Sequence, residues 1–429
     1  MKFFLHIIVA LICATPLFSQ SRFEKETFDD AEYFFATEAY RDALPLYLQL
    51  LKRNYRDNAN ILYRVGICYL NLPGEKAQAI EYLEKASQKA SSSYKKSSLK
   101  ESHAPLDSWL YLGNAYRVNT QLDKAIEAYE NYLRVSTKIS NLERDWVQIQ
   151  IDACKRAKDA IKNPIAVSFI PLGRPFGTKN NESNPVVTHD ERMAVYTVQQ
   201  KFYNAVYWVQ KKNGNWGTPV LLNPTIMSDG NLFPVSLSDD GKILLLNLID
   251  LDKSDIYISR WNGKRYTPAV PFKEINTKYW ESHACISSDG KTIYFTSNRS
   301  SSIGGLDIFF IELLPDSQWS APRNAGNIIN TPLNEETPFL SVTGDTLYFA
   351  SQGHNTIGGF DIFYSIRQSD GSWSEPINMG YPFNTPDDDL FYVPVNATTG
   401  YQSRYIPESK SMRIVKVLFE KNNLPSEHK

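Results

Sequence analysis

Cysteine is scarce in this chain of 429 residues. Only four occur, and three of them, Cys68, Cys154 and Cys285, lie beyond the N-terminal stretch. Three is an odd number, these three lie in separate segments, and no Cys-x-x-Cys pair occurs. A disulfide framework and a structural zinc site therefore lack support in the sequence. We expect free thiols that behave as small buried hydrophobic groups.

Signatures of catalysis and metal binding are missing as well. No two of the later histidines have metal-ligand spacing: His103, His189, His283, His354 and His428. A Gly-x-Ser-x-Gly elbow, a phosphate-binding loop and a dinucleotide fingerprint are absent. The acidic run Asp387–Asp389 is expected to be solvated rather than to bind Ca²⁺, because adjacent residues of a strand alternate sides. The sequence thus predicts a protein that is not an enzyme, with no cofactor and no metal.

An excess of charge of one sign is also lacking. Lysine and arginine total 46 against 47 aspartates and glutamates, which gives a net charge of −1. This balance offers no basic footprint for nucleic acid. Only one long apolar run occurs, near the N-terminus, which excludes a protein that crosses a membrane several times.

That apolar run predicts a signal peptide over residues 1–20. Lys2 precedes about a dozen apolar residues, and small Ser19 lies where cleavage is expected. A spanning helix needs roughly 20 apolar residues, so no direct membrane span is predicted. Cys13 raises the alternative of a lipoprotein, but bulky Ile12 before it disfavours lipidation. We therefore expect the mature chain to be exported.

Residues 21–163 show helical periodicity and an internal repeat. The clearest unit places Trp109, Leu112, Gly113 and Tyr116 ahead of Ala125 and Tyr129, the pattern W-x2-L-G-x2-Y-x8-A-x3-Y. This is the tetratricopeptide signature, in which small residues sit where two helices cross. A second unit is built on Gly66, Ala79 and Leu83, and a weaker first one on Ala31 and Ala43. We predict three helical hairpins, a closing helix over residues 142–161, and an exposed loop at residues 91–98.

Tetratricopeptide arrays bind a partner in a concave groove lined by the first helix of each hairpin. Counting from the packing positions gives these candidate partner-binding residues: Asn60, Tyr63, Ile67, Asp107, Leu110, Asn114 and Arg117. Tyr63 and Leu110 stand where a carboxylate clamp needs lysine, although Asn114 fits that clamp. A partly aromatic groove for a protein segment is therefore the favoured interpretation, and packing of the array on the next domain is the alternative.

Residues 164–420 are rich in short strand-like runs, and one block recurs. Asp289-Gly290, Asp307-Ile308-Phe309 and Trp319 are followed 54 residues later by Asp361-Ile362-Phe363 and Trp373. Looser copies bring the total to five, at steps of 50 to 54 residues. Four antiparallel strands and their turns need about this length, so each copy predicts one blade of a β-propeller.

Structural roles explain the repeated residues. Asp-Gly suits a tight turn with positive φ, the aspartate of Asp-Ile-Phe can accept backbone N–H bonds, and Trp-x-x-Pro can pack between blades. Residues 165–170 are expected to supply the missing strand of the final blade, opposite residues 414–419. The fold class is therefore α + β multidomain, an α-helical solenoid followed by an all-β propeller of five blades, with six as the alternative. Residues 421–429 form a C-terminal tail.

The block SSDGKTIYFTSNRS at residues 287–300, with GGLDIFF and WSAP, resembles the WD40-like repeats of TolB-type propellers. The order of signal peptide, tetratricopeptide array and propeller resembles a family of Gram-negative envelope proteins. Some members, of the PorE type, are accessory components of type IX secretion and gliding. Longer members carry an OmpA-like domain that holds peptidoglycan, and this sequence ends without one. The resemblance therefore implies a location in the periplasm, in association with the outer membrane, and at most indirect contact with peptidoglycan.

These patterns favour a periplasmic scaffold or adaptor. The groove and a propeller face would bind envelope proteins, as part of an assembly such as the type IX secretion machine. The alternative is a propeller that binds a ligand in its mouth, such as a glycan, a peptidoglycan fragment or a peptide.

Overall fold

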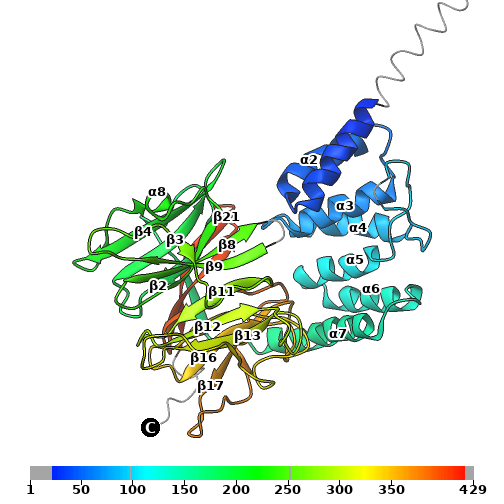
Figure 1. Ribbon diagram of the computed structural model, residues 1–429. Coiled ribbons are helices and arrows are strands. Elements are labelled where there is room, and N and C mark those ends of the chain that lie inside the picture. Colours follow the sequence, from blue (N-terminus) through cyan, green and yellow to red (C-terminus); the bar gives the residue numbers. More distant parts are fainter. Residues whose placement is uncertain (1–21, 97, 251–252, 421–429) are drawn as a thin grey trace, which may run out of the picture. The chain divides into compact units, whose positions relative to one another are not determined.

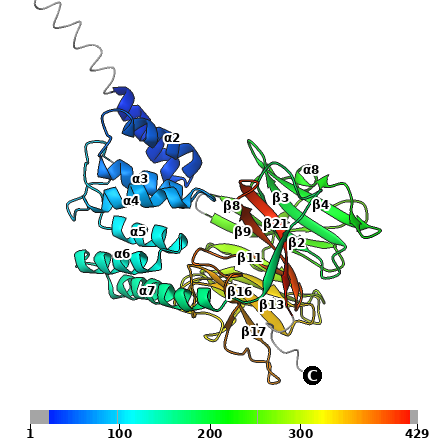
Figure 2. The same ribbon diagram turned by 180° about the vertical axis from the view of Figure 1, so that it is seen from behind.

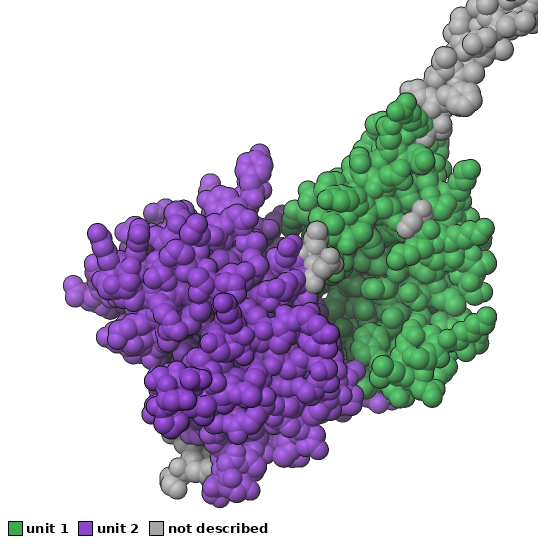
Figure 3. Space-filling view, viewed as in Figure 1, with its two compact units in different colours: residues 1–151 green, residues 152–429 purple. Residues whose placement is uncertain are grey.

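The structure is a computed structural model that describes residues 22–96, 98–250 and 253–420. The predicted signal peptide and the predicted tail at 421–429 lie outside these residues. The chain divides into two compact units, residues 1–151 and 152–429 (Figure 3). The division falls inside the last helix, whereas the sequence places the domain boundary after it, at Asn163.

The first unit is a stack of helical hairpins (Figure 1). Residues 22–36 form a helix that precedes the first of the labelled ones. The following elements are α2 (Tyr40–Leu51), α3 (Ala59–Leu70), the short η1 (Lys76–Gln78), α4 (Ala79–Ser87), α5 (Ser108–Val118), α6 (Leu122–Val135) and α7 (Asn141–Lys162). Three hairpins and a closing helix are therefore confirmed.

Glycine permits the close crossing of the two helices in a hairpin. A Cβ added to Gly66 of α3 would lie 2.4 Å from Leu83 of α4, and one added to Gly113 of α5 would lie 2.5 Å from the Tyr129 ring of α6. Leu83 and Tyr129 are fully buried. These glycines and large side chains are the pairs that the repeat pattern predicts at the crossings.

The second unit is a propeller of five blades, which confirms the predicted fold class and excludes six blades. The first blade contains β2 (Glu182–Val187), β3 (Met193–Gln199), β4 (Asn204–Lys212), β5 (Asn215–Trp216) and β6 (Val220–Leu221), followed by α8 (Asn223–Ile226). The second contains β7 (Leu232–Leu237), β8 (Ile243–Asp250), β9 (Lys253–Arg260) and β10 (Val270–Pro271).

The remaining blades repeat this order. The third contains β11 (Glu281–Ile286), β12 (Thr292–Ser297), β13 (Asp307–Glu312) and β14 (Arg323–Asn324). The fourth contains β15 (Glu335–Leu340), β16 (Thr346–Ser351), β17 (Asp361–Ile366) and β18 (Ile377–Asn378). The fifth contains β19 (Val393–Asn396), β20 (Thr399–Ile406), β21 (Ser411–Phe419) and β1 (Val167–Pro171).

The ring is closed by the strand that enters it first. β1 pairs antiparallel with β21, from Val167 opposite Phe419 to Pro171 opposite Val415. The expected pairing of residues 165–170 with the final blade is thus confirmed. Figure 2 shows β21, in red, among the green strands of the first blade. Joining the two ends of the propeller sequence in one sheet leaves no unpaired seam between the first and last blades.

The repeated residues have the structural roles predicted for them. Gly290 and Gly344 adopt positive φ, at 71° and 73°, in the turns before β12 and β16. Asp307 accepts hydrogen bonds from the backbone N–H groups of Ile303 and Gly304, at 2.6 and 3.2 Å. Trp373 of the fourth blade packs edge-on against Tyr294 of the third, with ring centroids 6.2 Å apart. The repeat therefore encodes turns and contacts between blades.

Candidate functional site

The predicted groove residues fall into two groups by exposure. Asn60, Ile67 and Arg117 are buried, at 0%, 5% and 5% exposure. Tyr63, Asp107, Leu110 and Asn114 remain accessible to solvent. Counting along the helices placed all seven on one face, but it did not show that neighbouring segments cover part of that face. Direct contact with a partner is therefore open to only four of the seven.

A buried polar network occupies the covered part of this face. The Arg64 side chain of α3 is 4% exposed and forms an ion pair with Glu32, which lies in the helix over residues 22–36. A second Arg64 nitrogen donates to Glu32 Oε2 at 2.8 Å. Arg64 also donates to Asn60 Oδ1, and the Tyr47 hydroxyl donates to Glu32. The charge is thus paired and hydrogen-bonded, as a buried guanidinium requires.

The loop between α4 and α5 completes this network. The Tyr94 hydroxyl donates to Asn60 Oδ1 at 2.9 Å and accepts from Arg64 at 3.0 Å. Asn60 Nδ2 donates to the Ser98 carbonyl at 3.2 Å. The sequence predicts an exposed loop at residues 91–98; Ser92 and Ser93 are exposed, whereas Tyr94 is half-buried against α3. This loop is what removes Asn60 from solvent.

What remains accessible is an aromatic and acidic patch on α3 and α5. We call Tyr63, Asp107, Leu110 and Tyr111 the groove patch. The rings of Tyr63 and Tyr111 meet edge to face, with centroids 5.7 Å apart. Partial burial and the nearby Glu143 carboxylate raise the pKa of Asp107 above its usual value. Asn114, beside the patch, is held by a 2.7 Å hydrogen bond from the Tyr129 hydroxyl. Rigid aromatic rings next to a carboxylate suit recognition of a protein segment.

The inner strands of the blades surround a small cavity. Inner strands of the blades contribute Val186, Leu237, Cys285, Phe339 and Val393 to a cavity of only about 20 Å³. Cys285 is buried, and burial raises the pKa of its thiol to about 12. A space of this size holds about one water molecule. This inner cavity is therefore too small for a sugar or a peptide.

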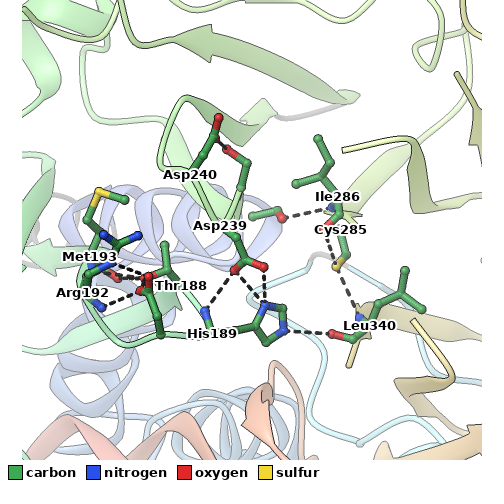
Figure 4. Close-up of polar contacts among 12 residues, drawn as sticks. Thr188, His189, Arg192, Met193, Asp239, Asp240, Cys285, Ile286 and Leu340 are labelled. Carbon is green, nitrogen blue, oxygen red and sulfur yellow. Dashed lines mark hydrogen bonds and ion pairs between the residues drawn. The ribbon is translucent and has the colours of Figure 1, made fainter. Parts of the chain in front are cut away.

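In the turn between β2 and β3, His189 is fixed by an aspartate from the next blade (Figure 4). Its Nδ1 lies 2.7 and 2.9 Å from the two carboxylate oxygens of Asp239, and its backbone N–H donates to Oδ1 at 3.0 Å. Burial raises the pKa of Asp239, but the hydrogen bonds from His189 outweigh that effect and lower it below the usual range. Nε2 lies 3.4 Å from the Leu340 carbonyl. Both ring nitrogens thus have partners, and the histidine joins three blades.

A second histidine lies near the start of the inner strand β11. His283 Nδ1 is 2.6 Å from Glu336 Oε2, and the Ser282 hydroxyl donates to both oxygens of the same carboxylate, at 2.9 and 2.8 Å. A serine nucleophile needs the imidazole, not the carboxylate, as its hydrogen-bond partner. Ser282, His283 and Glu336 therefore do not form the relay of a serine hydrolase.

Metal binding finds no support among the described residues. Over that part of the chain, no group of three or more histidine, cysteine, aspartate or glutamate side chains is placed to hold an ion. Within the same residues, no helix is both long and apolar enough to cross a bilayer.

A repeated Thr-x-x-x-Glu motif was not recognised in the sequence. Thr178, Thr277 and Thr331 each donate through the backbone N–H and the hydroxyl to a glutamate four residues later, and Thr385 does so to Asp389. These acids lie at or just before the inner strands, so the motif anchors the start of four blades. The recurrence of the pair at a step of 54 residues was the signal that could have revealed it.

Comparison with known proteins gives a family-model match and several similar solved structures. The family model for the tetratricopeptide repeat matches residues 28–94. A search of curated proteins found no match. Among solved structures, TolB from Acinetobacter baumannii is 16% identical; the match covers 56% of this chain and 55% of TolB, with a TM-score of 0.36. The chain thus spans about half the length of that TolB.

Other similar structures carry different activities in their names. The endo-arabinase from Bacteroides thetaiotaomicron is 14% identical over 59% of this chain and 98% of its own, with a TM-score of 0.39. The α-L-arabinofuranosidase from Podospora anserina is 12% identical over 59% of this chain and 94% of its own, with a TM-score of 0.36. At such identities and TM-scores the similarity carries no activity to this chain.

Proposed function

We propose that this chain is a non-enzymatic adaptor of the cell envelope, in which the groove patch binds a segment of a protein partner. The observation that carries this proposal is the pair of accessible tyrosines, Tyr63 and Tyr111, beside Leu110 and Asp107 on the first helices of two hairpins. Aromatic side chains contribute large contact areas at low entropic cost, which favours them in protein interfaces.

The groove patch also has a rigid base. Arg64 and Asn60 lie in α3, the helix that carries Tyr63, and their hydrogen bonds tie this helix to its neighbours. A patch held in place before binding loses less conformational entropy when the partner arrives. Support for the non-enzymatic part comes from Ser282 of β11, whose hydroxyl faces a carboxylate instead of an imidazole.

The proposed location is the periplasm, on the periplasmic side of the outer membrane, within an assembly such as the type IX secretion or gliding machinery. This part rests on the sequence of residues 1–20 and on the resemblance of the domain order to envelope proteins. Osmotic-shock fractionation tests the location, together with mass spectrometry of the mature N-terminus. An N-terminus near residue 20 in the periplasmic fraction is expected, and an uncleaved chain in the cytoplasm would contradict the proposal.

Partner binding is tested by affinity capture of the full chain after mild crosslinking of intact cells. The Tyr63→Ala and Leu110→Asp chains are compared with the wild type, and Tyr33→Ala is the control because Tyr33 is 65% exposed and lies outside the groove patch. A partner that is recovered with the wild type and Tyr33→Ala, but depleted with both groove variants, is the expected result. Equal recovery with all four chains would refute the role of the patch.

A further inference from the structure

A cavity on the side of the propeller is unexplained by the fold. It has a volume of about 450 Å³, within the range of small-molecule sites. The first blade contributes Arg192, Trp208 and Gln210 to its lining, and the second contributes Asp240, Trp261 and Tyr266. We call this cavity the lateral pocket.

The lateral pocket is built around two indole rings. Trp208 and Trp261 stack with centroids 5.7 Å apart and planes inclined by 29°. Tyr266 meets Trp261 edge to face at 5.3 Å and is itself fixed by a 2.6 Å hydrogen bond to the Gly241 carbonyl. Trp208 and Trp261 are half-buried, while Tyr266 is fully buried. The result is an aromatic surface with a rigid support.

The other blades show that the fold does not need these indoles. Trp208 of β4 lies opposite Val220 of the outer strand β6. The position of Trp208 is filled in the next three blades by Ile258, Phe310 and Tyr364. Trp261 forms an isolated β-bridge with Tyr266 in the second blade. At the equivalent position of the third and fourth blades, Leu313 bridges to Trp319 and Arg367 bridges to Trp373. Among the equivalent positions compared in the first four blades, the contact between the first and second is the one that combines two tryptophans.

Trp208 is also poorly suited to a purely structural role. Its Nε1–H is buried and has no hydrogen-bond partner. A buried donor without a partner destabilises a fold, and the phenylalanine found at this position in the third blade would avoid that cost. Residues that break a local rule of packing are expected at functional sites.

The charges around the lateral pocket are balanced. Arg192 pairs with Asp190, Lys211 lies 3.8 Å from Glu191, and Asp240 lies 3.1 Å from Lys242. A pocket for a phosphate would keep an excess of cations, and a pocket for an ammonium group an excess of anions. A neutral ring with one apolar face and a rim of hydroxyl groups fits best, since its C–H face can stack on indole while Gln210 and Asp240 meet its hydroxyls.

We propose that the lateral pocket binds a neutral pyranose sugar, stacked on Trp261 and held at its rim by polar side chains of the first and second blades. This proposal does not depend on the adaptor function, because the lateral pocket and the groove patch share no residue. Loss of sugar binding and loss of partner capture can therefore be observed separately.

The test is saturation-transfer NMR followed by calorimetry on the full chain. The probes are the methyl glycosides of glucose, galactose and N-acetylglucosamine, and the trimer of N-acetylglucosamine. Trp261→Leu introduces the residue that the third blade carries at this position, and Trp208→Phe likewise introduces the equivalent of Phe310. Phe310→Leu is the matched control, because it removes an aromatic ring from the same strand position outside the lateral pocket.

Binding of at least one probe is expected, with affinity lowered about tenfold by Trp261→Leu and unchanged by Phe310→Leu. Trp208→Phe should weaken binding without lowering the melting temperature, a combination that a purely structural residue would not give. Absence of binding by all four probes would overturn the proposal. So would equal affinity of the wild-type and Trp261→Leu chains when both have the same melting temperature.

Discussion

Arg64 shows how a single buried charge orders the helical unit. Its guanidinium pairs with Glu32, bonds to Asn60 and Tyr94, and lies 5.8 Å from the centroid of the Phe28 ring. These partners come from three helices or loops that are far apart in sequence. Periodicity predicts which helices form, but it does not predict a contact between residues 32 positions apart, so this network could not be found from the sequence.

Replacing Arg64 by methionine is predicted to destabilise the helical unit strongly. The substitution keeps much of the side-chain volume but leaves the Glu32 carboxylate, 18% exposed, without its counter-charge. Breaking a buried pair in this way costs about 3–5 kcal/mol. Urea unfolding followed by circular dichroism at the helical band measures the loss. Arg22→Met is the control, because Arg22 and Glu26 form an exposed pair, 83% and 61% accessible, worth about 0.5 kcal/mol. Equal stability of the two variants would contradict the network's role.

Glu335 is predicted to make the propeller less stable as the pH rises. Burial raises the pKa of this carboxyl from the ordinary 4.5 to about 7, although hydrogen bonds from Thr331 and Ser351 oppose the shift. Between these two pKa values the folded chain holds a proton on Glu335 that the unfolded chain releases. The contribution of Glu335 to the free energy of unfolding is therefore fully present below pH 4.5 and is lost as the pH rises to about 7. The full effect is on the order of 3 kcal/mol.

The Glu335→Gln chain isolates this contribution. Glutamine cannot ionise, so the variant should lose less stability than the wild type between pH 5 and pH 8 in parallel urea titrations. Other buried acids titrate equally in both chains and cancel in the comparison. Identical pH dependence of the two chains would show that Glu335 does not hold the proton.

At the scale of elements, β1 determines whether the propeller is closed. Phe169 of this strand stacks on Phe383, with centroids 6.5 Å apart, and the Arg404 guanidinium lies 4.0 Å from the centroid of the Phe169 ring. The apolar run over 165–170, together with the need of a propeller to close its ring, was sufficient to predict this strand and its partner. Strands and turns were predictable because each blade repeats the same local signals, the Asp-Gly turn and the Asp-Ile-Phe start.

Phe169→Ala is predicted to loosen the closure. Removing a half-buried ring that packs on Phe383 should cost about 2–3 kcal/mol, somewhat below the value for a fully buried phenylalanine. Ile170→Ala is the matched control on the same strand: its side chain is 47% exposed, so a change within about 0.5–1 kcal/mol is expected. Near-ultraviolet circular dichroism during thermal unfolding distinguishes the two. Comparable melting temperatures would mean that β1 contributes little to closure.

At the scale of the whole molecule, the two units differ in how far the sequence predicts their sites. The repeat pattern identifies the face of α3 and α5 that a groove would use, and Tyr63 and Leu110 are accessible there. It cannot show that the loop bearing Tyr94 buries Asn60, because that contact is tertiary. In the propeller the blades are nearly equivalent, so a site is marked only by departures such as Trp208 and Trp261, whose proximity needs the folded structure.

Site-specific photocrosslinking is the measurement that shows whether the groove patch contacts a protein partner. A photoreactive phenylalanine analogue is placed at position 63, at position 110, or at position 33 as the exposed control, and living cells are irradiated. If the groove patch binds a partner, one discrete crosslinked protein is expected from positions 63 and 110 and none from position 33. Crosslinks that are equally frequent at all three positions, or absent from both groove positions, would contradict it.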